Sequence, residues 1–218
     1  MKRLFVKILL LCTVLTMSSV PFVAGATGNV QSRAQKECLS PSKVQLKGDF
    51  RKLWIDHVTW TRSYIVSAIA GLEDQEKVLA RLLRNQQDIG NAIKPYYGEE
   101  AGNKLAELLR EHILLAGKVV EAAKTGNQVD LDKYNKEWYR NADDIAKFLS
   151  NANPNWSDKE LKELLHRHLQ LITDQVTARL KKDWDADIIA YDVGETHMIM
   201  FADVLADGII KQFPKKLK

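Results

Sequence analysis

Cysteine is scarce in this sequence, whose 218 residues include only Cys12 and Cys38. Cys12 lies in an apolar N-terminal run that is typical of a cleaved signal peptide, so one thiol would remain in the mature chain. A single thiol forms no intramolecular disulfide, and the fold must therefore be held together by its hydrophobic core alone. The roughly 190 residues that follow the predicted leader suffice for one substantial core, and we expect a single domain.

The predicted signal peptide covers residues 1–26. It has a basic start and the apolar run ILLLCTVLTMSSVPFV, and Ala24-Gly25-Ala26 offers the small residues that signal peptidase accepts. The apolar run is shorter than the ~20 residues of a bilayer span and contains Pro21, so we expect cleavage and no transmembrane span in the mature chain. The mature protein is then secreted or associated with the cell envelope.

A strong excess of one charge is also missing. Lys and Arg number 32 and Asp and Glu 28, and removal of Lys2, Arg3 and Lys7 with the leader leaves 29 against 28. Such a near-neutral surface gives no argument for a nucleic acid partner. The basic tail, residues 214–218, would make at most a weak contact with an anionic wall or membrane.

Motifs for catalysis are absent too. No serine sits in a Gly-x-Ser-x-Gly pattern, and Cys38 falls in a polar lead-in, residues 27–47, that we expect to be flexible. The spacings His-x-x-x-His, His-Glu-x-x-His and Cys-x-x-Cys-His do not occur. None of the four histidines that we place in the core below has a glutamate three residues before it, as di-iron bundles require. The sequence therefore leans towards a non-enzymatic role, and any metal site must be assembled from separate helices.

Helical periodicity runs through nearly all of the remaining chain, without a convincing alternating strand pattern. Gly71, Pro95 and Gly126 mark predicted helix ends, and Ser157 with Glu160 forms a capping box. Because short connections join antiparallel neighbours, we predict an all-α, up-and-down antiparallel helical bundle over residues 48–213. Its six predicted helices cover about residues 49–70, 73–94, 99–124, 130–150, 158–181 and 185–212.

Four histidines fall on the predicted core stripes of different helices. His112 continues the stripe of Leu105 and Leu109, and His168 continues that of Leu161 and Leu164. His197 shares a stripe with Val193, Met200 and Val204. His57 is the weakest of the four, because Trp54 and Val58 offer a competing stripe on its helix. His166 should point elsewhere.

The same histidines fall at one level of the bundle. At the rise of an α-helix, each lies roughly 18–22 Å from the turn that defines one end. The remaining helices bring Asn85, Gln86 and Asn141 near this level, with Asp88 and Asp143 at the flanks of their stripes. A polar layer across a bundle is costly unless its groups pair with one another or bind something.

Several imidazoles that face one another are how helical bundles hold Zn, Cu, Fe or Ni. We therefore predict a transition-metal site in which His112, His168 and His197 are the preferred ligands and His57 is the fourth. Asp143 or Asp88 would be a further ligand or would orient a ring. The alternative is an interaction or structural bundle whose histidines only fix helix register. A metal-dependent hydrolase or redox enzyme would need an open coordination position as well.

The strings LWIDHVTWTR, NQQDIGNAIKPYYG and DWDADIIAYD resemble a group of exported all-helical proteins from Gram-positive bacteria, over about residues 50–213. The resemblance implies an all-helical fold and supplies neither an activity nor site residues. Enzyme names attached to such chains include a glycosyltransferase and an acetylglutamate kinase. Those folds require parallel strands with glycine-rich loops, which this helical pattern lacks.

Overall fold

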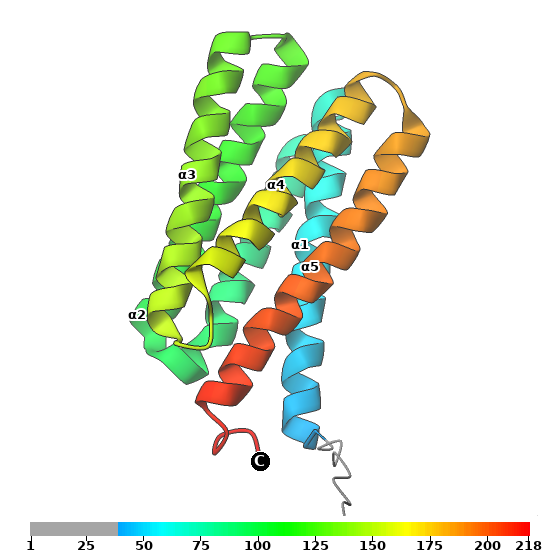
Figure 1. Ribbon diagram of the computed structural model, residues 1–218. Helices are drawn as coiled ribbons and strands as arrows, with labels where there is room; N and C mark the ends of the chain where they lie inside the picture. The colour runs from blue at the N-terminus through cyan, green and yellow to red at the C-terminus, as the bar shows by residue number, and fades with distance from the viewer. Residues whose placement is uncertain (1–38) are drawn as a thin grey trace, which may run out of the picture. The chain divides into compact units, whose positions relative to one another are not determined.

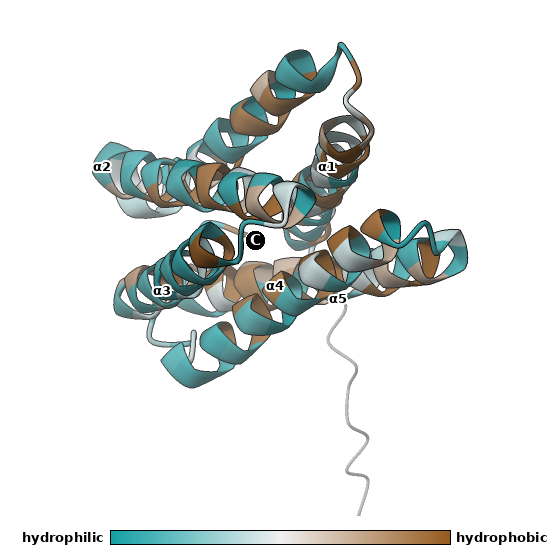
Figure 2. Ribbon diagram, turned by 90° about the horizontal axis from the view of Figure 1, so that it is seen from above, coloured by the Kyte–Doolittle hydropathy of each residue, from teal (hydrophilic) through white to brown (hydrophobic). Residues whose placement is uncertain are grey.

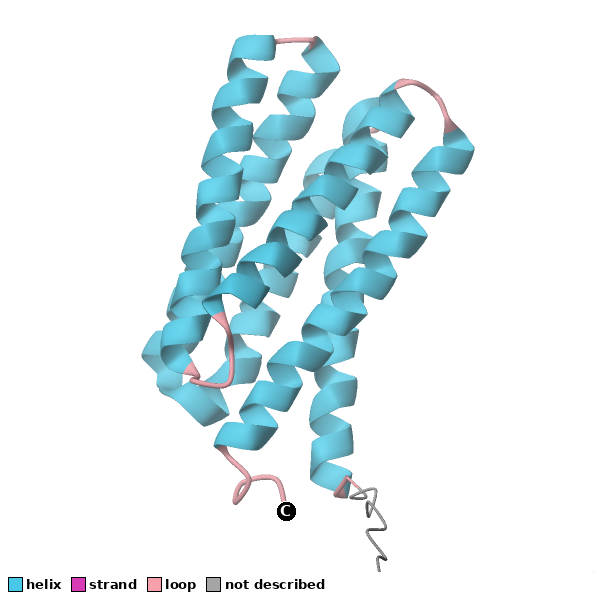
Figure 3. Ribbon diagram, in the orientation of Figure 1, coloured by secondary structure: helices cyan, strands magenta, loops and turns pink. Residues whose placement is uncertain are grey.

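The computed structural model describes residues 39–218, which contain five helices and no strand (Figures 1 and 3). The predicted signal peptide, Cys38 and most of the predicted lead-in lie outside these residues. An all-α bundle was predicted and is confirmed, with five helices in place of six. The helices are α1 (Pro41–Ala70), α2 (Gln75–Thr125), α3 (Gln128–Ala152), α4 (Asp158–Leu180) and α5 (Trp184–Gln212).

The first helix begins eight residues before its predicted start. The Ser40 side chain accepts a hydrogen bond from the backbone N–H of Lys43, and Pro41 occupies the first turn, where its missing N–H costs nothing. Residues 41–47, which were predicted to belong to a flexible lead-in, are therefore helical. Apolar spacing alone missed this start, because Ser40-Pro41 is a capping pattern inside a polar segment.

The difference in helix number arises at one bend in α2. Pro95 lies just before it, and Gly98 has the non-helical angles φ 88° and ψ 170°. The chain reverses direction there, so that residues 75–97 and 99–125 form two limbs that lie side by side (Figure 1). The limbs approach closely at two glycines: a Cβ atom on Gly90 would lie 2.5 Å from the carbonyl oxygen of Gly102. The helix predicted to end before Pro95 thus continues through Tyr97, and the break falls three residues later than expected, at Gly98.

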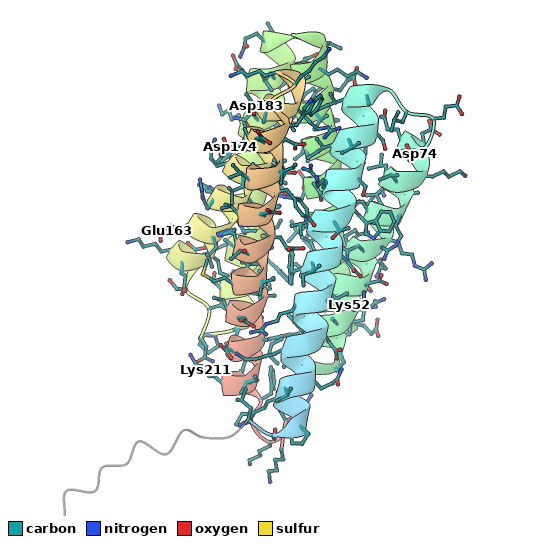
Figure 4. All side chains as sticks on the ribbon, turned by 90° about the vertical axis from the view of Figure 1, so that its right-hand side faces the viewer. Lys52, Asp74, Glu163, Asp174, Asp183 and Lys211 are labelled. Atoms are coloured by element: carbon teal, nitrogen blue, oxygen red, sulfur yellow. The ribbon has the colours of Figure 1, made fainter. Side chains whose placement is uncertain are left out.

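The helices form a closed ring of neighbours. In this ring α1 packs against α2 and α5, and α3 packs against α2 and α4, which in turn packs against α5. Seen from above, they surround a common interior, and each helix carries hydrophobic and hydrophilic residues (Figure 2). Charged side chains such as Asp74 and Glu163 project outwards (Figure 4). None of the helices in residues 39–218 combines the length and apolar character needed to cross a bilayer.

The C-terminal tail folds back onto the start of α1. Leu217 is only 4 % exposed, and the hydroxyl of Ser40 donates a hydrogen bond of 2.7 Å to its carbonyl oxygen. Lys216 donates to the carbonyl oxygen of Pro95 at 2.7 Å. The basic tail is therefore tied to the bundle through the carbonyl and the buried side chain of Leu217 and through the ammonium group of Lys216.

Candidate functional site

Three of the predicted histidines meet in the interior of the bundle. His57 on α1, His112 on the second limb of α2 and His168 on α4 are each 3 % exposed. The ring centroids of His57 and His168 are 5.7 Å apart, and those of His112 and His168 are 6.1 Å apart. Equal heights on neighbouring helices thus bring three imidazoles together around His168. We call these three residues the histidine cluster.

The hydrogen bonds of Asn141 fix the protonation of His112. The Asn141 amide nitrogen donates to the carbonyl oxygen of Leu108 at 3.1 Å, so its Oδ1 atom is the acceptor that faces the ring. Nδ1 of His112 lies 2.9 Å from that oxygen and must carry the proton. The Nε2 atom of His112 therefore keeps its lone pair, which is the form of imidazole that binds a metal ion.

The other two rings of the histidine cluster are less well satisfied. The Nδ1 atoms of His57 and His168 are buried and have no hydrogen-bond partner within residues 39–218. The nearby layer also contains Asn85, whose amide donates to the Leu53 carbonyl at 3.0 Å while its Oδ1 atom lacks a partner. Because a buried polar atom without a partner costs about 1–3 kcal/mol, these atoms mark a place where something could bind.

A small cavity lies between the rings. Its volume is about 20 Å³, which is room for about one water-sized group. Apart from the three imidazoles, its wall is mainly aliphatic. The wall consists of His57, Thr61, Tyr64, Ile65, Leu82, His112, Ile113, Ala116, Val120, His168 and Ile172.

Burial keeps these imidazoles neutral. It lowers the pKa of His57 to about 3, with a further contribution from the charge of His112, although the neighbouring Asn85 side chain opposes the shift. It lowers the pKa of His112 to about 4, although the hydrogen bond to Asn141 opposes the shift. The pKa of His168 is lowered by burial and then by the charges of the other core histidines. At neutral pH the cluster thus consists of uncharged rings, whose lone pairs can coordinate a cation.

No ring contact joins His197 to the histidine cluster, although it lies near enough for its charge to lower the pKa of His168. It is 8 % exposed, and its Nε2 atom donates to the carbonyl oxygen of Leu164 at 2.7 Å. The predicted stripe around it was wrong, because Val193 is 44 % exposed and Met200 is 50 % exposed. The buried face of α5 instead contains Gly194, Met198, Phe201, Ala202 and Leu205. A shift of one position around the helix therefore places His197 at the border of the core.

The two predicted carboxylates do not reach the histidine cluster. Asp143 lies 2.9 Å from Nε2 of His166, and both side chains are about two-fifths exposed. As expected, His166 thus points away from His168. Asp88 lies half-buried on α2, and no hydrogen bond or ion pair joins it to a histidine within residues 39–218. Asn141, rather than either aspartate, orients a ring of the cluster.

The sequence pattern missed a buried ionic network near the end of the bundle where α4 turns into α5. The carboxylate of Asp187 is 2 % exposed and accepts hydrogen bonds of 2.8–2.9 Å from Arg62 and Arg179. Acidic residues near a helix N-terminus ordinarily interact with its dipole at the surface, and Asp187 lies in the first turn of α5. Only the packing of α5 against α1 and α4 shows that the Asp187 carboxylate is buried and joins these three helices.

No family model matches the chain, and no curated protein or solved structure shows significant similarity to it. The geometry alone must therefore indicate what the cluster does. Within residues 39–218, no three His, Cys, Asp or Glu side chains are placed ready to hold a metal ion. A ligand of the histidine cluster would have to draw its rings into new positions.

Proposed function

We propose that the protein binds one transition-metal ion through His57, His112 and His168. The observation that carries this proposal is the meeting of three neutral, buried imidazoles around a cavity, with two ring nitrogens that lack partners. Such atoms are costly in a core and become favourable when a cation accepts their lone pairs. His197, Asp88 and Asp143 are left out of this smaller ligand set.

The separations between the rings are compatible with a shared ion. With metal–nitrogen bonds of about 2.0–2.1 Å, two imidazoles on one ion have centroids roughly 5–6.5 Å apart. The values of 5.7 Å and 6.1 Å lie within this interval. Rotation of the side chains, rather than movement of helices, would then complete the site. Neutral imidazole ligands suit Zn, Cu, Fe or Ni.

Asn141 would orient His112 towards the ion through its other nitrogen. A hydrogen bond to one nitrogen of a ligating imidazole fixes both its tautomer and its direction. The cavity leaves room for about one small group beside the rings. The proposal is therefore for a bound ion, in structure, storage or sensing, and not for turnover of a substrate.

Metal analysis of mature protein without a histidine tag tests the proposal. After incubation with each ion and removal of the excess, we expect about one equivalent of Zn, Cu, Fe or Ni per chain. His168→Asn should remove it, because His168 contacts both other rings. His166→Asn is the matched control, since this histidine lies outside the cluster and its loss should leave the ion in place.

A structural role for the histidines is the second candidate. It is favoured by the hydrogen bonds of His112 to Asn141 and of His197 to the Leu164 carbonyl, each of which ties two helices together. In this case no ion is retained, and His168→Asn changes only the stability of the bundle. The same metal analysis therefore separates the two functions.

We also propose that the mature bundle acts outside the cytoplasm, as the N-terminal pattern and the resemblance to exported Gram-positive proteins indicate. Cleavage after Ala26 would leave Thr27 as the first residue. N-terminal sequencing of the protein recovered from medium and cell wall tests this. A chain recovered only from cells, with Met1 in place, would contradict it.

A further inference from the structure

A second pocket lies at the end of the bundle where α1, α2 and α4 terminate and α5 begins, far along the helices from the chain ends (Figure 1). Its volume is about 430 Å³, which falls in the range of small-molecule sites. It shares no lining residue with the histidine cavity. The lining consists of Ile69, Ala70, Lys124, Arg179, Leu180, Lys182 and Trp184.

The lining combines positive charge with an exposed aromatic ring. Lys124, Arg179 and Lys182 bring three cations from different segments, and no acidic residue is among the lining residues. Trp184 is 52 % exposed, which is unusual for the largest and most costly apolar side chain to leave in water. A flat apolar wall beside several cations is suited to a ligand that is both apolar and anionic.

The parts of this pocket are held in position by the rest of the bundle. The guanidinium of Arg179 lies over the Trp184 ring, 5.3 Å from its centroid, and is fixed by its hydrogen bond of 2.8 Å to Asp187. Lys124 is oriented by a hydrogen bond of 2.7 Å to the carbonyl oxygen of Ala68. A site whose groups are already oriented loses little entropy when a ligand enters.

The turn that carries Lys182 has an uncommon backbone. Lys182 has φ 61° and is the one residue other than glycine with a positive φ in residues 39–218. This is the conformation of the residue that follows a helix in a Schellman motif: the N–H of Lys182 donates to the carbonyl oxygen of Arg179, and that of Asp183 to the carbonyl oxygen of Ala178. The motif ends α4 and fixes the backbone from which the Lys182 side chain leaves. The neighbouring acid, Asp183 (labelled in Figure 4), uses its Oδ1 atom to cap α5 through the N–H of Ala186.

We infer that this pocket binds a small organic anion with a flat apolar body, of the class of aromatic carboxylates. The ring would stack on Trp184, and the carboxylate would interact with Lys182 and Lys124. The alternative is that these cations bind no ligand and only balance the partial negative charge of the carbonyl groups at the C-terminal ends of α1 and α4. That alternative predicts no saturable ligand.

Benzoate is a suitable probe, with benzyl alcohol as its neutral counterpart and phenyl phosphate as a second anion. We expect benzoate to shift the indole N–H resonance of Trp184 saturably, and benzyl alcohol to bind at least fivefold more weakly. The resonance is assigned by its loss in Trp184→Phe. Tighter binding of phenyl phosphate than of benzoate would assign the site to phosphate esters and would overturn the carboxylate class.

The variants distinguish a built pocket from diffuse charge. Lys182→Ala and Lys124→Ala should each weaken benzoate binding at least fivefold, whereas Lys181→Ala should leave it unchanged, because Lys181 is exposed but does not line the pocket. Circular dichroism checks that each variant is folded. An equal effect of Lys181→Ala, or no saturable shift up to about 10 mM benzoate, would overturn the inference.

Discussion

The Oδ1 atom of Asn141 accepts a hydrogen bond of 2.9 Å from Nδ1 of His112. Its amide nitrogen is fixed in turn by the carbonyl of Leu108, one turn before the histidine on the same limb of α2. Both side chains are buried, so water cannot replace either partner. The pair therefore joins α2 to α3 and selects one tautomer of the ring.

Asn141→Ala should lower the free energy of unfolding by about 2–4 kcal/mol, because it leaves the His112 N–H without a partner and opens a void. Urea denaturation of the metal-free protein measures the loss. Asn91→Ala, at an exposed position of α2, should change stability by less than about 0.5 kcal/mol. Equal effects of the two substitutions would refute the buried hydrogen bond.

Acid should destabilise the metal-free bundle between pH 6.5 and 5. The buried histidines have folded-state pKa values below the ordinary 6.5, about 3 for His57 and about 4 for His112. In this window the unfolded chain takes up protons and the folded chain does not, so stability is full above pH 6.5 and falls as pH decreases. Each such histidine contributes up to about 1.4 kcal/mol per pH unit.

Urea midpoints at several pH values measure this dependence, and His168→Leu should reduce its slope. Burial opposes the change at Asp187, yet hydrogen bonds from Arg62 and Arg179 lower its pKa below the ordinary 3.8. Its own loss of stability therefore comes below this window. A flat profile from pH 6.5 to 5 would show that the histidines are accessible to protons in the folded state.

Loss of the Asp187 carboxylate should be far more damaging than loss of a surface acid. Asp187→Asn leaves Arg62 and Arg179 partly buried without a counter-charge, and we expect a loss of about 3 kcal/mol in thermal or urea unfolding. Asp203→Asn breaks the more exposed pair with Arg51 and should cost about 0–1 kcal/mol. The reverse order would contradict the assigned network.

Tyr64 should control how quickly an ion reaches the histidine cluster, if one binds there. Tyr64 and Ile113 line the inner cavity and also an outer groove of about 320 Å³. Tyr64→Ala should therefore speed metal uptake at least tenfold without changing the final stoichiometry, as followed by stopped-flow with Co²⁺. Tyr134→Ala, on α3, is the control. Uptake at the same rate in both variants would place the access route elsewhere.

The contact between the limbs of α2 allows a test of the backbone. Gly90→Ala would place a Cβ atom 2.5 Å from the Gly102 oxygen and 2.7 Å from Ala106 Cβ, so we expect a loss of about 1–3 kcal/mol. At Gly48 nothing lies within 4 Å of the added atom, and Gly48→Ala should gain about 0.5–1 kcal/mol of helix stability. A gain at both glycines would mean that the limbs lie further apart.

Sequence patterns predicted the fold well wherever a single residue type enforces a local structure. Gly126 ends α2 in the left-handed conformation that glycine adopts readily, and Ser157 accepts from the N–H of Glu160 as a capping box requires. Pro95 lies three residues before the bend at Gly98. The heights of His57 and His168 along the bundle were predicted from helix lengths alone. These features need no knowledge of the neighbouring helices.

Rotation around each helix was harder to predict. On α5, two neighbouring faces contain nearly the same number of apolar residues, so the pattern does not decide which one is buried. The face that was predicted to be buried includes Val193 and Met200, which lie at the surface. The site residues show the same limit. Asn141 was recognised as a polar residue at the right level, but that Asn141 and not Asp143 contacts His112 depends on which face α3 turns towards α2.

The return of the C-terminal tail to Ser40 brings both ends of the described chain to one side of the bundle. A fusion or tag at Lys218 would therefore emerge next to anything attached ahead of Ser40. If the protein were tethered to a cell surface from that side, the opposite tip, with Trp184 and its neighbouring cations, would be displayed outermost. Labels placed at Lys218 would then leave that tip unobstructed.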